Sequence, residues 1–378
     1  MVKAAYLHIP FCEHICHYCD FNKVFLKGQP VDAYLQAIDQ EMKLTVTRRQ
    51  SEPLKTIFVG GGTPTSLNEK QLYTFCESIL QNLQKEKQTE FTFEANPGDL
   101  TKEKLQIMQQ AGVNRLSLGV QTFNDELLKK IGRVHRAKDV FTSVANAKEI
   151  GFENISIDLI FSLPGQTISD FNDTLAKAFS LNVTHYSGYS LIIEPKTVFY
   201  NLMKKGKLHT PGEDVEAEMY ELLMEQMELN GLHQYEISNF AKPGFESRHN
   251  LTYWNNDPYY GFGAGAHSYV NGWRRSNIGP LKKYLDSIQR GQLPIFEEHF
   301  VTKPEQMEEE MFLGLRKTKG VSIEKFHEKF QMNPLDHFQA EIEQLKEKGW
   351  IEVADGFIYL TKVGRLLGDE VFQSFLGA

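Results

Sequence analysis

The sequence predicts an α/β protein whose amino-terminal half is an incomplete (β/α)6 TIM-like barrel, followed by a smaller, mainly helical domain that resembles a winged helix. Two observations predict this architecture. Six short runs rich in β-branched and aromatic residues recur between residues 4 and 192, and most precede an amphipathic helical pattern. From about residue 297 the sequence becomes helical and strongly acidic.

Length and composition indicate a folded, soluble protein. The 378 residues suffice for two or three domains, and 41% apolar with 24% charged residues is typical of globular proteins. The net charge of −8 leaves no broad positive surface, so we expect no nucleic-acid partner. No apolar run approaches the ~20 residues of a membrane span, and no export signal is visible, so we expect a cytoplasmic protein that is not integral to a membrane.

The alternation of strands and helices predicts a parallel sheet covered by helices, because parallel strands need long crossovers. The predicted strands are Ala4–Ile9, Thr56–Val59, Glu90–Ala95, Arg115–Val120, Asn154–Ile160 and His185–Ile192. The predicted helices are Val31–Thr47, Glu69–Gln84, Lys102–Gln110, Asp125–Ile131, Ala137–Glu149 and Ile168–Phe179. Six units fall short of a closed barrel, so we expect a wide mouth at the carboxyl ends of the strands, with the functional residues there.

Three of the four cysteines lie within eight residues of the loop after the first strand. Cys12, Cys16 and Cys19 are separated by three and then two residues, a spacing that lets three thiolates converge on one centre. Cys76 lies in a helical pattern, where a buried structural thiol is expected.

Several interpretations of the cysteine loop compete. A redox pair of Cys16 and Cys19 would leave Cys12 unexplained, and three unconnected thiols would be a chemical liability. An iron-sulfur cluster held by three cysteines would leave one iron open to an exogenous molecule. A zinc ion would need a fourth ligand, for which the candidates are His8, His14 and His17. The spacing favours the cluster and leaves zinc open.

Further polar residues follow the predicted strands. Gly60-Gly61-Gly62-Thr63-Pro64-Thr65 follows the second strand, Glu94 ends the third, Gln121 closes the fourth and Asp158 lies in the fifth. Each of these residues taken alone is typical of an ordinary turn or helix cap. Together they would lie at the same rim of the barrel, at the carboxyl ends of the strands.

Beyond Pro195 the sequence pattern is interpreted as helix and loop. We expect three parts: residues 1–195 as the partial barrel, 196–296 as an extension containing the sequence HNLTYW at 249–254, and 297–378 as a separate domain. The last part carries 10 basic and 16 acidic residues, which opposes DNA binding and favours packing or protein contact. Its predicted elements are helices Glu305–Thr318, Ile323–Phe330 and Pro334–Lys348, then strands Trp350–Val353 and Phe357–Leu360 joined at Asp355-Gly356.

The cysteine loop, GGGTPT, Glu94, GVQTF and IDLIFSLPG, in this order, resemble the radical S-adenosylmethionine (SAM) family over residues 4 to about 195. The run YLHIPFC at 6–12 and the later HNLTYW resemble the oxygen-independent coproporphyrinogen III oxidase group over nearly the whole chain. The resemblance implies that Cys12, Cys16 and Cys19 hold a 4Fe-4S cluster whose fourth iron is chelated by SAM. Reductive cleavage of SAM would then yield a deoxyadenosyl radical.

The resemblance also implies a set of SAM-binding residues. Glycines without Cβ atoms would let the backbone approach the methionine moiety, Glu94 would accept from an ammonium or ribose hydroxyl, and the remaining polar groups would address ribose and carboxylate. Transferred position by position, the set is Tyr6, Tyr18, Gly61, Gly62, Thr63, Glu94, Gln121, Arg133 and Asp158.

One departure from the oxidases decides the branch. The oxidases carry a further cysteine two residues after the third, where this chain has Phe21, and its motif begins without their leading arm. Both features resemble the heme-chaperone branch (HemW-like), whose members bind heme and deliver it to heme-requiring proteins. A histidine can ligate heme iron and aromatic rings offer flat apolar surface. The heme-binding motif of that branch corresponds to His249, Asn250, Tyr253 and Trp254.

We therefore expect a heme chaperone that binds a 4Fe-4S cluster, SAM and heme, with heme-accepting proteins as partners, no catalytic residues and no coproporphyrinogen oxidase activity. The first alternative is an oxygen-independent coproporphyrinogen III oxidase, and the second is a zinc-binding protein without radical chemistry. A homodimer is compatible with the sequence, which does not fix the oligomeric state.

Overall fold

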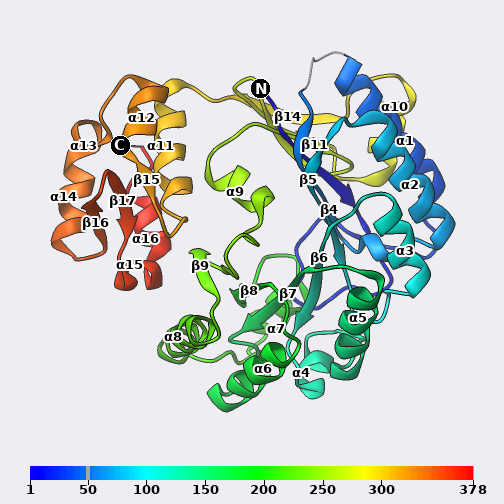
Figure 1. The fold of residues 1–378 in the computed structure, drawn as a ribbon, viewed down its shortest axis with the longest axis horizontal. Helices are drawn as coiled ribbons and strands as arrows, with labels where there is room; N and C mark the ends of the chain where they lie inside the picture. The colour runs from blue at the N-terminus through cyan, green and yellow to red at the C-terminus, as the bar shows by residue number, and fades with distance from the viewer. Residues whose placement is uncertain (48–51, 378) are drawn as a thin grey trace.

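The computed structural model describes residues 1–47 and 52–377 and is organised around one curved sheet (Figure 1). Its six central strands run parallel and in chain order, so the predicted partial barrel is confirmed. They are β1 (Ala4–Ile9), β4 (Leu54–Gly61), β5 (Lys85–Ala95), β6 (Arg115–Gln121), β7 (Asn154–Phe161) and β8 (His185–Ser190). Each inner strand is bonded on both sides, and the barrel is left open laterally.

The predicted helices cover the outer face of this sheet (Figure 1). They are α1 (Val31–Thr47), α2 (Glu69–Asn82), α3 (Lys102–Gln110), α4 (Asp125–Lys130), α5 (Ala137–Ile150) and α6 (Ile168–Ser180). In α2 the apolar side chains Leu72, Phe75, Cys76 and Ile79 lie on one face and are buried, which confirms Cys76 as a structural thiol. Among the described residues, no helix combines the length and apolarity needed to cross a bilayer.

The expectation of helix and loop between residues 196 and 296 was wrong, because this segment also supplies five strands and the start of a sixth. They extend the central sheet at both edges: β11 (Tyr259–Phe262) pairs with β1, and β12 (His267–Val270), β13 (Trp273–Asn277) and β14 (Ile295–Phe300) follow. At the other edge β10 (Asn239–Ala241) and β9 (His233–Glu236) add to β8. These strands are short and rich in polar residues, so their sequences carry little strand pattern.

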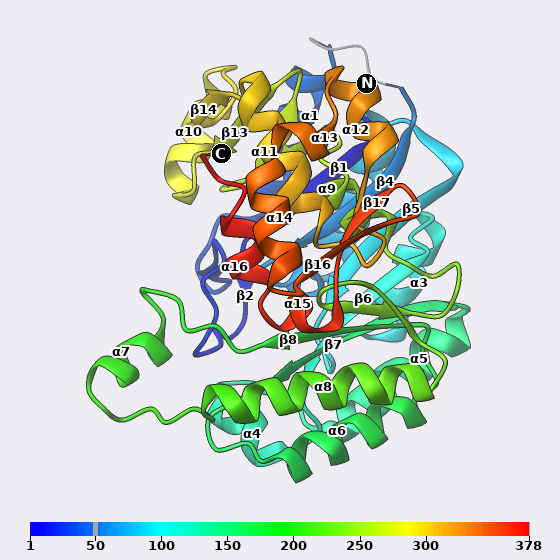
Figure 2. The ribbon, with the colours of Figure 1, turned by 90° about the vertical axis from the view of Figure 1, so that its left-hand side faces the viewer.

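Four helices accompany these strands. They are α7 (Val198–Lys204), α8 (Glu213–Leu229), α9 (Arg248–Trp254) and α10 (Leu281–Gln289). Figure 2 shows α8 running beside α6, while α7 stands out from the rest of the fold. The short helix α9 lies between the open side of the partial barrel and the carboxy-terminal part of the chain (Figure 1).

The carboxy-terminal residues pack around a hydrophobic core of their own, which includes Met311, Phe326, Phe338 and Leu345. The helices are α11 (Lys303–Gly314), α12 (Ile323–Phe330), α13 (Pro334–His337), α14 (Gln339–Glu347), α15 (Lys362–Leu366) and α16 (Gly368–Gln373). The hairpin predicted at Asp355-Gly356 joins β16 (Ile351–Ala354) to β17 (Phe357–Leu360), and β15 (Val321–Ser322) completes a three-stranded sheet. A mainly helical final domain is thus confirmed, and the boundaries at 195 and 296 stay predictions.

Candidate functional site

The cysteine loop follows β1, as predicted, at the carboxyl ends of the barrel strands. Cys12 lies in β2 (Phe11–Cys12), which pairs with β3 (Val24–Phe25), and its thiol is buried. Thr63 Oγ1 lies 3.6 Å from Cys12 Sγ. A Cβ atom on Gly62 would lie 2.9 Å from the same sulfur and 2.9 Å from the backbone oxygen of Phe11, so this position requires glycine.

Burial affects two of the three thiols, those of Cys12 and Cys19. Burial raises the pKa of Cys12 to about 11, while the Thr63 hydrogen bond lowers it and the charges of Cys19 and Cys16 raise it. Burial likewise raises the pKa of Cys19, and the nearby Lys23 opposes that rise. Since each ionised thiol disfavours the next, a cationic centre would be needed to hold all three as thiolates. This is the donor set that an iron-sulfur cluster requires, and none of the cysteines is in a disulfide.

A single-ion site is not preformed here. Within residues 1–47 and 52–377 no group of three or more His, Cys, Asp or Glu side chains is arranged to hold a metal ion. Of the histidines considered as a fourth zinc ligand, His8 has both ring nitrogens engaged, with Nε2 2.7 Å from the Asn22 carbonyl oxygen and Nδ1 3.0 Å from the Tyr6 hydroxyl. His17 is tied by Nδ1 to the Lys130 carbonyl oxygen at 2.9 Å.

Arg133 lies beside the cysteine loop. Its Nη1 donates to Asn96 Oδ1 at 2.6 Å and its Nη2 donates to the Tyr18 hydroxyl at 3.1 Å. Its Nε is buried and has no hydrogen-bond partner among the described residues. Burial alone would lower the pKa of the guanidinium, but Tyr18, Cys16 and Cys19 together outweigh burial and raise that pKa. An unpaired buried donor at this position fits an anionic ligand group.

Gln121 ends β6 in a strained conformation. Its φ is +67°, which is uncommon for a residue with a side chain, and the β6–β7 register shifts between Gly119 and Gln121. A Cβ atom on Gly119 would lie 2.9 Å from Gln121 Nε2 and 3.0 Å from Arg133 Nη2, so both polar groups flank this glycine. The bulge therefore turns Gln121 towards the Arg133 side of the rim.

Gly61 and Glu94 connect the cysteine loop to the interior of the barrel. The Gly61 backbone N–H donates to Glu94 Oε2 at 3.0 Å, and a Cβ atom on Gly61 would lie 2.5 Å from the His8 ring. Burial, reinforced by the charge of Asp158, raises the pKa of Glu94 to about 8. Asp158 accepts hydrogen bonds from Ser187 at 2.7 Å and Ser117 at 3.2 Å, and burial raises its pKa as well.

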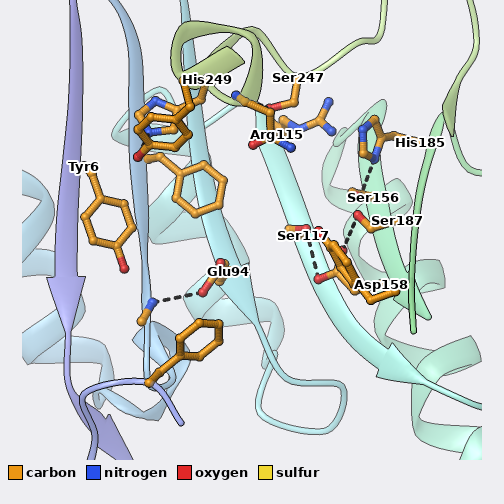
Figure 3. A pocket seen from close by; sticks show the side chains of 16 residues that line it. Tyr6, Glu94, Arg115, Ser117, Ser156, Asp158, His185, Ser187, Ser247 and His249 are labelled. Carbon is orange, nitrogen blue, oxygen red and sulfur yellow. Dashed lines mark hydrogen bonds between the residues drawn. The ribbon is translucent and has the colours of Figure 1, made fainter. Parts of the chain in front are cut away.

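A cavity of about 250 Å³ lies inside the partial barrel (Figure 3). Seven residues predicted from the sequence line it: Tyr6, Gly61, Glu94, Asp158, His249, Asn250 and Tyr253. Apart from the three cysteines, six others do not: Tyr18, Gly62, Thr63, Gln121, Arg133 and Trp254. The first five of these lie at the cysteine-loop end of the fold, next to the cavity, whereas Trp254 lies elsewhere.

His249 closes the cavity at the amino ends of the strands, opposite the cysteine loop (Figure 3). Its ring stacks on Phe58, with Nδ1 2.9 Å from Thr56 Oγ1 and Nε2 2.9 Å from the Tyr253 hydroxyl. Burial lowers the pKa of the imidazole to about 3, so it is neutral at physiological pH. Both nitrogens are engaged, and a metal could bind Nε2 only after Tyr253 releases it.

Trp254 points away from the cavity towards the carboxy-terminal domain. The Arg316 guanidinium lies over its ring at 4.6 Å and over Phe372 at 5.2 Å. The reason is helical geometry, because residues four apart share a face of α9 while the fifth is turned by a further 100°. The motif is therefore divided, with His249 and Tyr253 facing the cavity and Trp254 facing the domain contact.

Sequence reasoning missed the polar residues that line the rest of the cavity. They are Arg115, Ser117, Ser156, His185, Ser187 and Ser247, together with the aromatic residues Phe58 and Tyr189. Most stand at alternate positions of β6, β7 and β8, such as Ser156 and Asp158 in β7. A period of two in polar residues within otherwise apolar parallel strands is the signal that could have found them.

The sequence matches two family profiles. Residues 6–178 match the Radical SAM superfamily, and residues 301–367 match the HemN C-terminal domain.

The relatives that match over the full length of the chain include heme chaperones named HemW. The chain is 58% identical over 377 residues to the heme chaperone HemW of Bacillus subtilis, with all of both chains covered. It is 46% identical to the heme chaperone HemW of Lactococcus lactis, covering 99% of this chain and 97% of the relative. The solved structure of coproporphyrinogen III oxidase (HemN) from Escherichia coli, a radical SAM enzyme, superposes with a TM-score of 0.87 at 24% identity over 99% of this chain and 90% of that one, which shows a shared fold.

Proposed function

Because the chain belongs to the radical SAM superfamily and, within it, to the heme chaperone HemW family, we propose that it binds heme and delivers it to heme-requiring proteins. The observation that carries the proposal is the shared cavity. It reaches from Gly61 and Phe21, beside the cysteine loop, to His249, Asn250 and Tyr253 of the HNxxYW sequence. A heme-binding motif and the cysteine loop thus lie at two ends of one space.

The family brings a 4Fe-4S cluster and SAM, and we assign their ligands within this chain. Cys12, Cys16 and Cys19 hold the cluster, which when bound supplies an iron with a coordination position open to SAM. Arg133 offers its unpaired Nε to a carboxylate, and Glu94 offers a carboxyl oxygen to an ammonium or hydroxyl group. The remaining SAM-binding assignments are Tyr6, Tyr18, Gly61, Gly62, Thr63, Gln121 and Asp158.

Phe21 supports the chaperone rather than the oxidase alternative. It occupies the position where the oxidases carry a further cysteine, and its side chain is 63% exposed at the edge of the cavity. An aromatic ring there offers apolar surface to a flat ligand but no thiol. We propose that the chain works in the cytoplasm, that its partners are heme-accepting proteins, and that a homodimer is to be tested by sedimentation.

The test uses the full chain reconstituted with iron and sulfide without oxygen. Heme is titrated with and without SAM, and the loaded protein is then mixed with an apo heme protein whose spectrum reports transfer. We expect saturable binding and transfer. Failure to bind heme, or conversion of coproporphyrinogen to protoporphyrinogen when SAM and a reductant are supplied, would overturn the proposal.

A further inference from the structure

We propose that the deep end of the cavity is a subsite for a ligand carboxylate, held by the guanidinium of Arg115. Arg115 begins β6, and its side chain is 2% exposed. Among the side chains that line the cavity in the described chain, it is the single arginine or lysine. The subsite lies at the α9 end, apart from the residues assigned to SAM.

One nitrogen of the Arg115 guanidinium is held by hydrogen bonds, and the other two nitrogens are available to a ligand. Nη1 donates to Asn154 Oδ1 at 2.8 Å and to the Phe245 carbonyl oxygen at 3.0 Å. Within residues 1–47 and 52–377 both hydrogen bonds of the side chain are made through Nη1, which leaves Nε and Nη2 without a partner, and the guanidinium forms no ion pair with a carboxylate there. A buried cation is costly unless an anion pairs with it, and these two nitrogens form the edge that binds a carboxylate with two hydrogen bonds.

The basic and acidic side chains that line the cavity lie at different heights in it. Figure 3 places Arg115 beside Ser247 at the α9 end, with Glu94 and Asp158 nearer the carboxyl ends of the strands. Asp158 takes its hydrogen bonds from Ser117 and Ser187 rather than from Arg115. The charge of Arg115 acts on Asp158, whose pKa it lowers, but no hydrogen bond joins the two side chains, so the free edge of the guanidinium is open to a ligand carboxylate.

His185 does not compete for this role. Its Nδ1 lies 2.7 Å from Ser156 Oγ and its Nε2 lies 2.9 Å from the Tyr235 hydroxyl. Burial, and then the charge of Arg115, lower its pKa well below the usual value, so the ring is neutral. Arg115 thus remains the cationic group at this end of the cavity.

The size of the cavity restricts the ligand. A volume of about 250 Å³ is below the ~300–1,000 Å³ of pockets that enclose drug-sized molecules, so it fits a small acid or one arm of a larger ligand. Phe21 and Tyr189, which are 63% and 40% exposed, line the cavity where it meets solvent. The identity of the carboxylate rests on the proposed function: if the chain binds heme, the carboxylate is a heme propionate. A free dicarboxylic acid is the other source of the same chemistry.

The experiment compares ligands with and without free carboxylates. Heme, heme dimethyl ester and glutarate are titrated against the reconstituted full chain and against Arg115→Met and Arg115→Lys. Arg275→Met is the matched control, because Arg275 pairs with Glu298 outside the cavity. We expect wild type to bind heme at least about tenfold more tightly than the ester, and Arg115→Met to reduce that preference to within about twofold. Arg115→Lys keeps the charge without the planar fork and should fall between.

Each outcome decides between the possibilities. Equal binding of heme and its ester by wild type, together with no glutarate binding, would overturn the subsite while leaving heme binding intact. Glutarate binding that Arg115→Met abolishes, without discrimination between heme and ester, would assign the subsite to a free acid. Absence of all heme binding would overturn the proposed function instead. The comparison of ligands on wild type keeps the test valid even if Arg115→Met fails to fold.

Discussion

The imidazole of His249 is bound to Thr56 at the amino end of β4, 2.9 Å from Nδ1 to Oγ1. Gly61, the residue before the Gly62 that contacts Cys12, ends the same strand five residues later, about 16 Å along it. The proposed heme-binding motif and the proposed cluster site are therefore separated by the length of the barrel interior. A ligand that reaches both must extend through the cavity or move α9.

The first prediction concerns the hydrogen bond between His249 and Tyr253. Replacing Tyr253 by Phe keeps the aromatic ring but frees Nε2, so heme affinity should rise about two- to tenfold, the equivalent of one hydrogen bond. His249→Ala should weaken heme binding while leaving iron and sulfide content unchanged. Spectroscopic heme titration checks both, and an unchanged affinity and spectrum in His249→Ala would show that this imidazole is not an axial ligand.

The second prediction concerns the pH dependence of SAM binding. The pKa of Glu94 is raised to about 8, so the carboxyl is mostly protonated at pH 7 and becomes a stronger acceptor as it ionises. SAM affinity should therefore rise with pH up to and through about 8, by at most tenfold per pH unit. Glu94→Gln should bind SAM more weakly and without this rise. Equilibrium dialysis at several pH values measures it, and an identical pH profile in the variant would assign the titration to another group.

The third prediction tests the glycine beside Cys12. Gly62→Ala places a methyl group against Cys12 Sγ and the backbone of Phe11, where no flexible side chain can yield. We expect a loss of about 1–3 kcal/mol of stability and a clear loss of bound iron and sulfide. Gly212→Ala is the control, since its φ is −71° and nothing lies within 4 Å of the added Cβ atom. Equal iron content in both variants would show that Gly62 is not needed for binding of the cluster.

The fourth prediction concerns Glu41, which is buried between α1 and the strands of the extension. It accepts from Gly263 N at 2.8 Å, Asn277 Nδ2 at 2.6 Å and the Tyr284 hydroxyl at 2.6 Å, and burial raises its pKa to about 7. A raised carboxyl pKa stabilises the fold at low pH, and that contribution is lost as pH rises from about 4.5 through about 7, up to about 3 kcal/mol. Glu41→Gln should flatten this part of the stability profile. Urea unfolding at several pH values in this range measures the free energy of unfolding. If that free energy falls as steeply with pH in Glu41→Gln as in the wild type, Glu41 is not the group responsible.

The barrel could be predicted from local sequence pattern, because most of its strands precede a helix with a continuous apolar face. The strands of the extension escaped prediction for a physical reason. A segment such as Trp273–Asn277 is a strand only because β12 and β14 lie on either side of it, and neither neighbour is marked by sequence periodicity. The cysteine loop could be found from spacing alone, since all three thiols lie within eight residues.

The interior of the site was harder to predict than its rim. Arg115 looks like the polar start of an ordinary strand, and its place in the cavity follows from the face of β6 that it shares with Ser117. Trp254 was assigned together with His249 because the motif was interpreted as a unit. The sequence analysis assigned no helix to these residues, and it is α9 that turns Trp254 away from His249 towards Arg316.

The pairing of β1 has a consequence for synthesis on the ribosome. Ala4 pairs with Thr56 on one side and with Tyr259 on the other, so one neighbour is made early and the second only after some 200 further residues. Until β11 is made, one edge of β1 has no partner strand, and the cysteines that follow β1 lie in an incomplete sheet. Nascent chains stalled before β11 should thus be the ones that need protection from oxidation and from pairing with other strands.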